Sequence, residues 1–170
     1  MERTIIIDEN LYPPRRNWRF CHELAHILLG HTKSEVITRE MEWEADRYAG
    51  ELMLPSEQFR EDMASLDLSG LKVKYNHASW EAIARRWSQL KPAVLTIFDN
   101  EKQTCRIAPE NLVCPPIPTQ PELEAIREAY RIKQTVRRSA SEDVSLFMQA
   151  YFIDEGRGVE RVLLLTEVVE

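Results

Sequence analysis

The sequence predicts an α+β fold, in which a helical core packs on a small, mostly antiparallel sheet, with a helix-turn-helix-like unit and a short C-terminal α/β appendage. Apolar residues recur at helical spacing through the first half of the chain, which predicts amphipathic helices. The second half contains short apolar and β-branched runs bounded by turn residues, which predict strands. Hydrophobic side chains make up 44% of the 170 residues, and a chain of this size buries a substantial core.

The N-terminal half predicts one short strand followed by a series of helices. The apolar run 4–7 predicts a buried strand, and Pro13-Pro14 is expected to break the chain after it. Amphipathic periodicity then predicts helices over about 16–29, 39–54, 56–64, 70–75 and 79–90. Gly30 is the expected stop of the first helix, and Ser56 and Ser79 are the expected caps of the third and the last.

The last of these helices belong to a helix-turn-helix-like unit over about residues 56–91. Its final helix, 79–90, has an apolar packing side, so Arg85 and Arg86 are expected mainly on the exposed side. Two arginines are few for a helix that reads DNA bases or binds phosphates. The unit is therefore predicted to be structural, or a docking surface for a protein, rather than a DNA reader.

The second half begins with a predicted hairpin, in which strands 93–98 and 104–107 flank the turn 99–102. A charged helix over about 122–138 and two strands, 144–153 and 159–169, follow. The two strands are long enough to need a partner sheet. They either complete the N-terminal sheet or pair across a dimer.

Four prolines between positions 114 and 121 mark the one credible linker. We therefore expect an N-terminal domain over 1–114, a Pro-rich linker over 115–121 and a C-terminal α/β segment over 122–170.

Charge and cysteine content exclude several classes of protein. The net charge of −6 argues against broad, non-specific binding of nucleic acid. The longest apolar run, 93–98, is far too short to span a membrane, and no secretory signal is evident. The three cysteines, Cys21, Cys105 and Cys114, form no C-x-x-C pair and are expected to be reduced thiols. The sequence predicts a cytoplasmic protein.

Residues 22–26, His-Glu-Leu-Ala-His, form an HExxH motif inside a predicted helix. Residues four apart lie one turn apart on the same face, so His22 and His26 can bind one metal ion. Two neutral imidazoles and a carboxylate suit zinc and leave a position for water, whose pKa falls to roughly 7. Glu23 is placed to take a proton from that water and pass it to a leaving amine. The alternative is a chance motif with two ordinary, half-buried histidines.

The next predicted helix offers a third ligand. Glu44 falls on a polar stripe that is expected to be solvated, whereas Glu42 borders the apolar face and is favoured as the ligand. Asp46, one turn after Glu42, can accept the outer N–H of a ligand histidine and fix its tautomer. Otherwise Asp46 is a surface carboxylate that pairs with an arginine.

The two segments together resemble the ImmA/IrrE family of bacterial metallopeptidases. Residues 19–31, RFCHELAHILLGH, and 42–55, EWEADRYAGELMLP, carry the resemblance, and the helix-turn-helix-like region extends it. The resemblance implies a gluzincin-type site with His22, His26 and Glu42 as zinc ligands, Glu23 as base and Asp46 behind a histidine. It also implies limited cleavage of a helix-turn-helix transcriptional repressor that controls stress or mobile-element genes.

Other polar residues have simpler explanations. His31 is expected to be a helix-end residue whose charge suits the helix dipole, not a ligand. His77 is either a surface histidine or a group that stabilises an oxyanion, and Tyr48 either packs in the core or polarises a carbonyl. Cys21, where the family usually has a small apolar residue, is expected to pack in the core.

A zinc-stabilised, non-catalytic binding module that docks a regulatory protein or DNA is the alternative function. Family members usually carry a helix and further strands before the segment that corresponds to 4–7, and this chain has few residues there. The expected partner is a protein substrate, a DNA-binding repressor. Membrane association and direct binding of nucleic acid are not expected, and a homodimer is left open.

Overall fold

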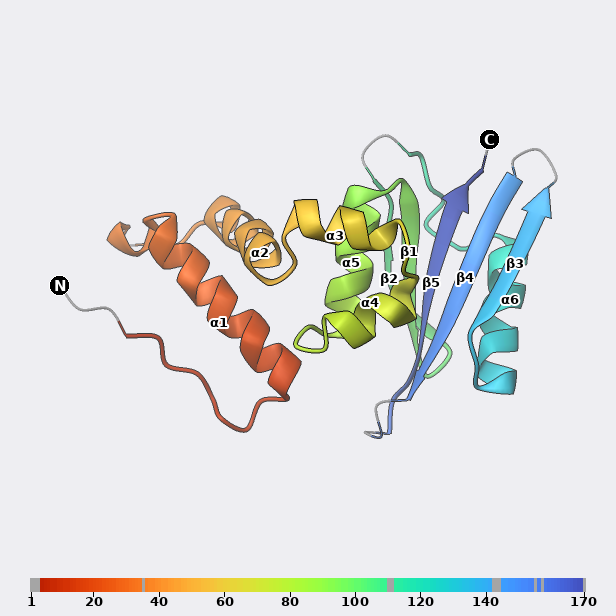
Figure 1. The fold of residues 1–170 in the computed structure, drawn as a ribbon, viewed down its shortest axis with the longest axis horizontal. Helices are drawn as coiled ribbons and strands as arrows, with labels where there is room; N and C mark the ends of the chain where they lie inside the picture. Colours follow the sequence, from red (N-terminus) through yellow and green to blue (C-terminus); the bar gives the residue numbers. More distant parts are fainter. Residues whose placement is uncertain are drawn as a thin grey trace. The chain divides into compact units, whose positions relative to one another are not determined.

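The computed structural model describes residues 4–34, 36–109, 112–141, 145–154, 156 and 158–169 (Figure 1). The chain divides into two compact units, residues 1–86 and 87–170. The first is helical, and the second contains an antiparallel sheet and a helix, so the predicted α+β class is confirmed. Over the described ranges, no helix combines the length and the apolar character needed to cross a membrane.

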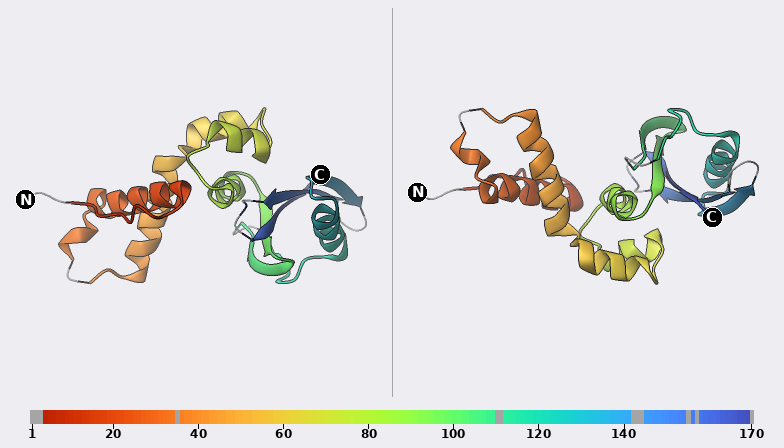
Figure 2. Two further views of the ribbon diagram at one scale, coloured as in Figure 1. Left: turned by 90° about the horizontal axis from the view of Figure 1, so that it is seen from below. Right: turned by 90° about the horizontal axis from the view of Figure 1, so that it is seen from above.

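Helices make up the first unit. In chain order they are α1 (Pro13–Leu28), the 3-10 helix η1 (His31–Lys33), α2 (Arg39–Met53), α3 (Ser56–Met63), α4 (Leu68–Lys74) and α5 (Trp80–Leu90), whose last turn lies in the second unit. α2 packs against α1 and crosses it (Figure 2). The side chain of Thr38 caps α2 by accepting a hydrogen bond from the backbone N–H of Met41. Asp67 caps α4 in the same way.

Two predictions for the N-terminal segment are wrong. Residues 4–7 form no strand, and the side chain of Ile6 is 90% exposed. A strand needs a neighbour for its backbone hydrogen bonds, and every described strand lies within residues 93–168. Pro13-Pro14 does not break the chain but begins α1, because the first turn of a helix needs no backbone N–H and favours the fixed φ of proline.

Only one of the two serines that the sequence predicts as helix caps has this role. Ser79 caps α5, since its hydroxyl accepts a hydrogen bond of 3.1 Å from the helix backbone. Ser56 is the first residue of α3 and does not cap it; its hydroxyl donates to Glu51 and accepts from Arg86. Arg86 was predicted on the exposed side, but it is only 6% exposed and also donates to the carbonyl of Leu54. The guanidinium therefore ties α5 to the end of α2.

The second unit is built on one five-stranded antiparallel sheet with the order β2-β1-β5-β4-β3. The strands are β1 (Ala93–Asp99), β2 (Lys102–Ile107), β3 (Val136–Ser141), β4 (Ser145–Asp154) and β5 (Glu160–Val168). α6 (Gln120–Ile132) packs on β3, β4 and β5, with Ala129 and Tyr130 in the same core as Leu164 (Figure 2). The predicted hairpin is confirmed, and Asn100 and Glu101 in its turn both have positive φ.

The predicted helix over 122–138 is correct only in its first part. α6 ends early because Lys133 takes the left-handed conformation, with φ of 56°. The residues that follow form β3, and Arg138 pairs from this strand with Glu124 and Glu128 of α6. Arg138 therefore holds α6 to the sheet.

The last two strands pair with each other, and β5 also pairs with β1, so they complete a sheet within the chain. The Pro-rich segment 115–121 leads from β2 to α6 inside the second unit, and the carbonyl of Pro115 accepts a hydrogen bond from Arg106. Arg106 also pairs with the buried carboxylate of Glu122, which accepts from the hydroxyl of Thr166 as well. The domain boundaries that the sequence suggests stay a prediction.

Candidate metal centre

α1 and α2 bring three metal-ligating side chains together. His22 and His26 lie one turn apart on α1, and their Nε2 atoms are 3.1 Å apart. Glu42 of α2 places Oε2 3.2 Å from Nε2 of His22 and Oε1 3.7 Å from Nε2 of His26. One ligand atom from each of these three residues lies within 4.8 Å of the other two. The histidines are largely buried and Glu42 is half exposed, so the cluster is accessible from solvent.

These separations fit a tetrahedral metal site. Ligand atoms that lie about 2.0–2.1 Å from a zinc ion at tetrahedral angles are about 3.3 Å from one another. The two histidine nitrogens, at 3.1 Å, and Oε2 of Glu42, at 3.2 Å from His22, are close to this value, whereas it is the other oxygen of Glu42, Oε1, that lies 3.7 Å from His26. Two imidazole nitrogens and one carboxylate oxygen are also donors that zinc prefers. The residues therefore fit a zinc ion.

Asp46 contacts the outer nitrogen of the His22 ring. Its Oδ1 lies 2.9 Å from Nδ1 of His22. An ionised carboxylate only accepts hydrogen bonds, so the contact assigns the proton of a neutral His22 to Nδ1. The lone pair is then on Nε2, the atom that faces His26 and Glu42. This is the tautomer that a metal ligand needs, held by the kind of carboxylate contact that commonly supports one.

Glu44 and His31 form a second pair beside the cluster. Oε2 of Glu44 lies 3.1 Å from Nε2 of His31, and Nδ1 of His31 lies 3.1 Å from Nδ1 of His26. Glu44 thus contacts His31, whereas Glu42 contacts the two histidines of the motif. The sequence predicts an ordinary helix-end residue at His31, but the structure buries this side chain. The signal that reveals it is the glycine before it, which turns the chain back toward α1.

Glu23 lies next to the first histidine of the motif and is half-buried on α1. Among the described residues its carboxylate has no hydrogen-bond or ion-pair partner. The carboxylate is therefore available to a bound water molecule or substrate.

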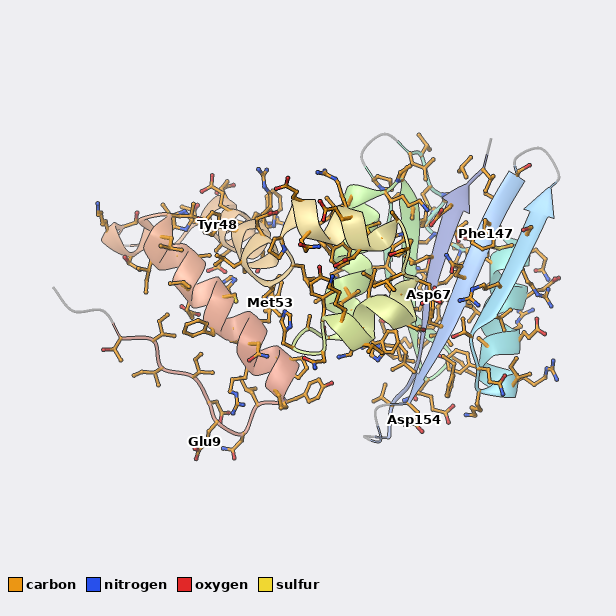
Figure 3. All side chains as sticks on the ribbon, in the orientation of Figure 1. Glu9, Tyr48, Met53, Asp67, Phe147 and Asp154 are labelled. Carbon is orange, nitrogen blue, oxygen red and sulfur yellow. The ribbon has the colours of Figure 1, made fainter. Side chains whose placement is uncertain are left out.

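His77, Tyr48 and Cys21 are the remaining residues that the sequence singles out. Nε2 of His77 lies 3.1 Å from the carbonyl oxygen of Met53, so this histidine links the turn before α5 to the end of α2. Tyr48 lies on α2 with its side chain partly exposed, not packed in the core (Figure 3). Cys21 is half-buried rather than in the core, and burial raises the pKa of its thiol, which keeps it protonated at neutral pH.

One family of known proteins matches the helical unit. The sequence model of the IrrE N-terminal-like domain, Peptidase_M78, matches residues 2–88, just over half of the chain. The chain belongs to this family. Its members are metal-dependent metallopeptidases, and the match confirms the resemblance that residues 19–31 and 42–55 carry. The match includes α1 to α4 and most of α5, whereas all five strands lie outside it.

Similarity to individual proteins is weak. No curated protein matches the sequence at a significant level. Among solved structures, the sensor domain of the zinc-responsive histidine kinase CzcS from Pseudomonas aeruginosa is 18% identical, with a TM-score of 0.37 over 72% of this chain and 96% of that chain. A TM-score this low carries no argument about fold or function.

Proposed function

We propose that this protein is a zinc-dependent endopeptidase that makes a limited cut in a helix-turn-helix transcriptional repressor of stress or mobile-element genes. The observation that carries the proposal is the convergence of His22, His26 and Glu42 at separations that fit zinc. Membership of a metallopeptidase family supports the same reaction class. The nature of the substrate rests on the resemblance to the ImmA/IrrE family.

Each of these side chains has a defined role in the proposed reaction. His22, His26 and Glu42 would hold the ion, and Asp46 would keep His22 in the tautomer that binds it. Zinc, when bound, lowers the pKa of water to roughly 7 and polarises a carbonyl group as a Lewis acid. Glu23 takes a proton from the water that attacks the peptide carbon, and delivers it to the nitrogen that leaves when the C–N bond breaks.

The surroundings of α5 support a protein substrate rather than nucleic acid. Arg86 is buried and pairs with Glu51, and Arg85 pairs with Glu81 one turn away. Both arginines are thus engaged within the chain, and α5 offers little positive charge to phosphates. The three cysteines are free, which supports the proposed cytoplasmic, reducing location.

The variant Glu23→Gln tests the catalytic proposal, because it keeps the shape of the side chain but removes the base. We expect cleavage of candidate repressors by the zinc-loaded chain to fall at least about 100-fold, the typical contribution of a general base. Glu57→Gln, the same change at an exposed position of α3, is the matched control and should leave the rate unchanged. Unchanged cleavage by Glu23→Gln would overturn the proposal.

The alternative is a zinc-stabilised binding module that docks a regulatory protein or DNA without cutting it. One observation favours it: the described part of the first unit has no strand that could align an extended substrate by strand addition. This alternative predicts a bound metal, no turnover and full biological effect from Glu23→Gln. The proposed peptidase predicts that the same variant loses the effect.

A further inference from the structure

His31 is buried beside the proposed metal site, although none of the roles assigned above uses it. α1 ends at Leu28, and Gly30 then adopts the left-handed conformation, with φ of 78°, which glycine adopts at no steric cost. This turn places His31 at the start of η1, with only 6% of the residue exposed. Complementing the helix dipole does not require a histidine to be buried, nor both of its ring nitrogens to have partners. The burial of His31 therefore needs another explanation.

Both ring nitrogens of His31 have partners. Nδ1 lies 3.1 Å from Nδ1 of His26, and the two rings meet edge to face with centroids 5.1 Å apart. On the opposite side of the ring, Nε2 lies 3.1 Å from Oε2 of Glu44, whose side chain is 67% exposed. The contacts form a chain from a carboxylate in solvent, through a buried imidazole, to a histidine of the HExxH motif.

The contacts assign the protons along this chain. The carboxylate of Glu44 only accepts, so the proton of a neutral His31 is on Nε2 and its lone pair is on Nδ1. Nδ1 of His26 must then be the donor in the contact with His31, because two lone pairs would repel each other. This assignment leaves the lone pair of His26 on Nε2, which lies 3.1 Å from Nε2 of His22. The lone pairs of the two motif histidines then face each other, an arrangement that a cation between them would stabilise.

The two histidines of the motif are thus supported in different ways. Asp46 contacts His22 directly, whereas Glu44 acts on His26 through His31. In both cases the outer nitrogen donates, and the inner nitrogen presents its lone pair to the same point. Contacts that fix the tautomer and ring orientation of a ligand histidine typically change metal affinity 10–100-fold when they are removed.

We propose that His31 and Glu44 are positioning residues that hold His26 in its metal-binding tautomer and orientation. The inference rests on the proposed metal site, and it gives Glu44 a role as an outer support rather than as a ligand. It explains why His31 is buried and why Glu44 contacts it.

Zinc affinity of the purified full chain tests this proposal without any substrate. Zinc is removed and returned in competition with a chelator of known affinity. His31→Phe, which keeps a ring but has no nitrogen, is expected to weaken binding by about 10–100-fold. Glu44→Ala is expected to weaken it by about tenfold, and Glu44→Gln, which still offers an acceptor oxygen, should recover most of this loss. A purely structural role would not produce such recovery.

Glu40→Ala is the matched control, because Glu40 is also exposed and lies one turn before Glu44 on α2. If His31→Phe fails to fold, the three glutamate variants decide the matter on their own. Affinity for zinc that is equal in Glu44→Ala, Glu40→Ala and the unaltered chain would overturn the positioning role and leave the proposed peptidase intact. Failure of the unaltered chain to bind zinc would overturn the metal site itself, and the positioning role with it.

Discussion

Glu122 in the second unit and Glu42 in the first hold their charges in opposite ways. In the second unit, Glu122 is buried and accepts hydrogen bonds from Arg106, Thr119 and Thr166, so its charge is satisfied inside the protein. In the first unit, Glu42 and its neighbours are at least half exposed, and each contacts a buried histidine. The buried pair of Glu122 therefore stabilises the fold of the second unit, whereas the carboxylates of Glu42, Glu44 and Asp46 surround a site that fits a cation.

Apolar side chains show the same contrast. Leu164 of β5 is fully buried in the core beneath α6. On α1, Phe20 and Leu28 are apolar residues two helical turns apart, yet they are 47% and 55% exposed. Local periodicity identifies a helix correctly but does not tell how much of its apolar stripe is covered.

Removing the buried charge of Glu122 is expected to have the largest effect on stability. Glu122→Ala leaves the Arg106 guanidinium buried without its partner, and loss of one member of a buried pair costs about 3–5 kcal/mol. The free energy of unfolding, measured in urea, should fall by this amount. Hydrogen exchange should show the loss in the strands of the second unit. A change below about 1 kcal/mol, the value for an exposed pair, would contradict the contrast between the units.

A matched pair of leucine variants compares the two apolar surfaces. Leu164→Ala removes fully buried methyl groups and should lower the free energy of unfolding by about 2–5 kcal/mol. Leu28→Ala makes the same change on the exposed part of α1 and should alter it by about 0.5 kcal/mol or less. Equal losses in the two variants, measured by urea unfolding, would show that Leu28 is covered in solution.

Acid should affect both units, but the second more strongly. Burial raises the pKa of Glu122, but the hydrogen bonds from Thr166 and Thr119 and the nearby Arg106 outweigh it, and the pKa lies below its ordinary value of 4.5. A pKa that is lower in the folded state gives stability that is fully present above the unfolded value. This stability is lost as the pH falls through the folded value. Urea unfolding at a series of pH values below 4.5 measures the loss.

Glu51 in the first unit is the comparison for this measurement. Its slight burial raises the pKa, but hydrogen bonds from Ser56 and the nearby Arg86 lower it to about 2. Because half of its side chain is exposed, solvent screens these contacts. We expect Glu122→Gln to remove more of the acid dependence than Glu51→Gln does. The reverse order would show that the exposed pair is the stronger one.

The sequence correctly predicts the elements that depend only on residues close together in the chain. The paired motifs on α1 and α2 belong to single helices, and the hairpin of β1 and β2 depends on the short turn between two apolar runs. These elements, and the family, are confirmed. The roles of the individual site residues stay predictions that the proposed variants test.

The features that the sequence misses depend on contacts between distant residues. β3 exists because it pairs with β4, and its two arginines look like the basic end of the preceding helix when only neighbours are considered. Residues 4–7 look like a strand but have no partner in the described part of the chain. Arg86 is buried because acceptors from α2 and α3 surround its guanidinium, which no helical periodicity indicates.

The metal content of the purified chain tests the proposed zinc site most directly. Elemental mass spectrometry should find close to one zinc ion per unaltered chain, loss of zinc in Glu42→Ala, and full zinc in the control Glu40→Ala. An unaltered chain that holds no zinc after reconstitution at neutral pH, or a Glu42→Ala chain that holds as much as the unaltered one, would contradict the site.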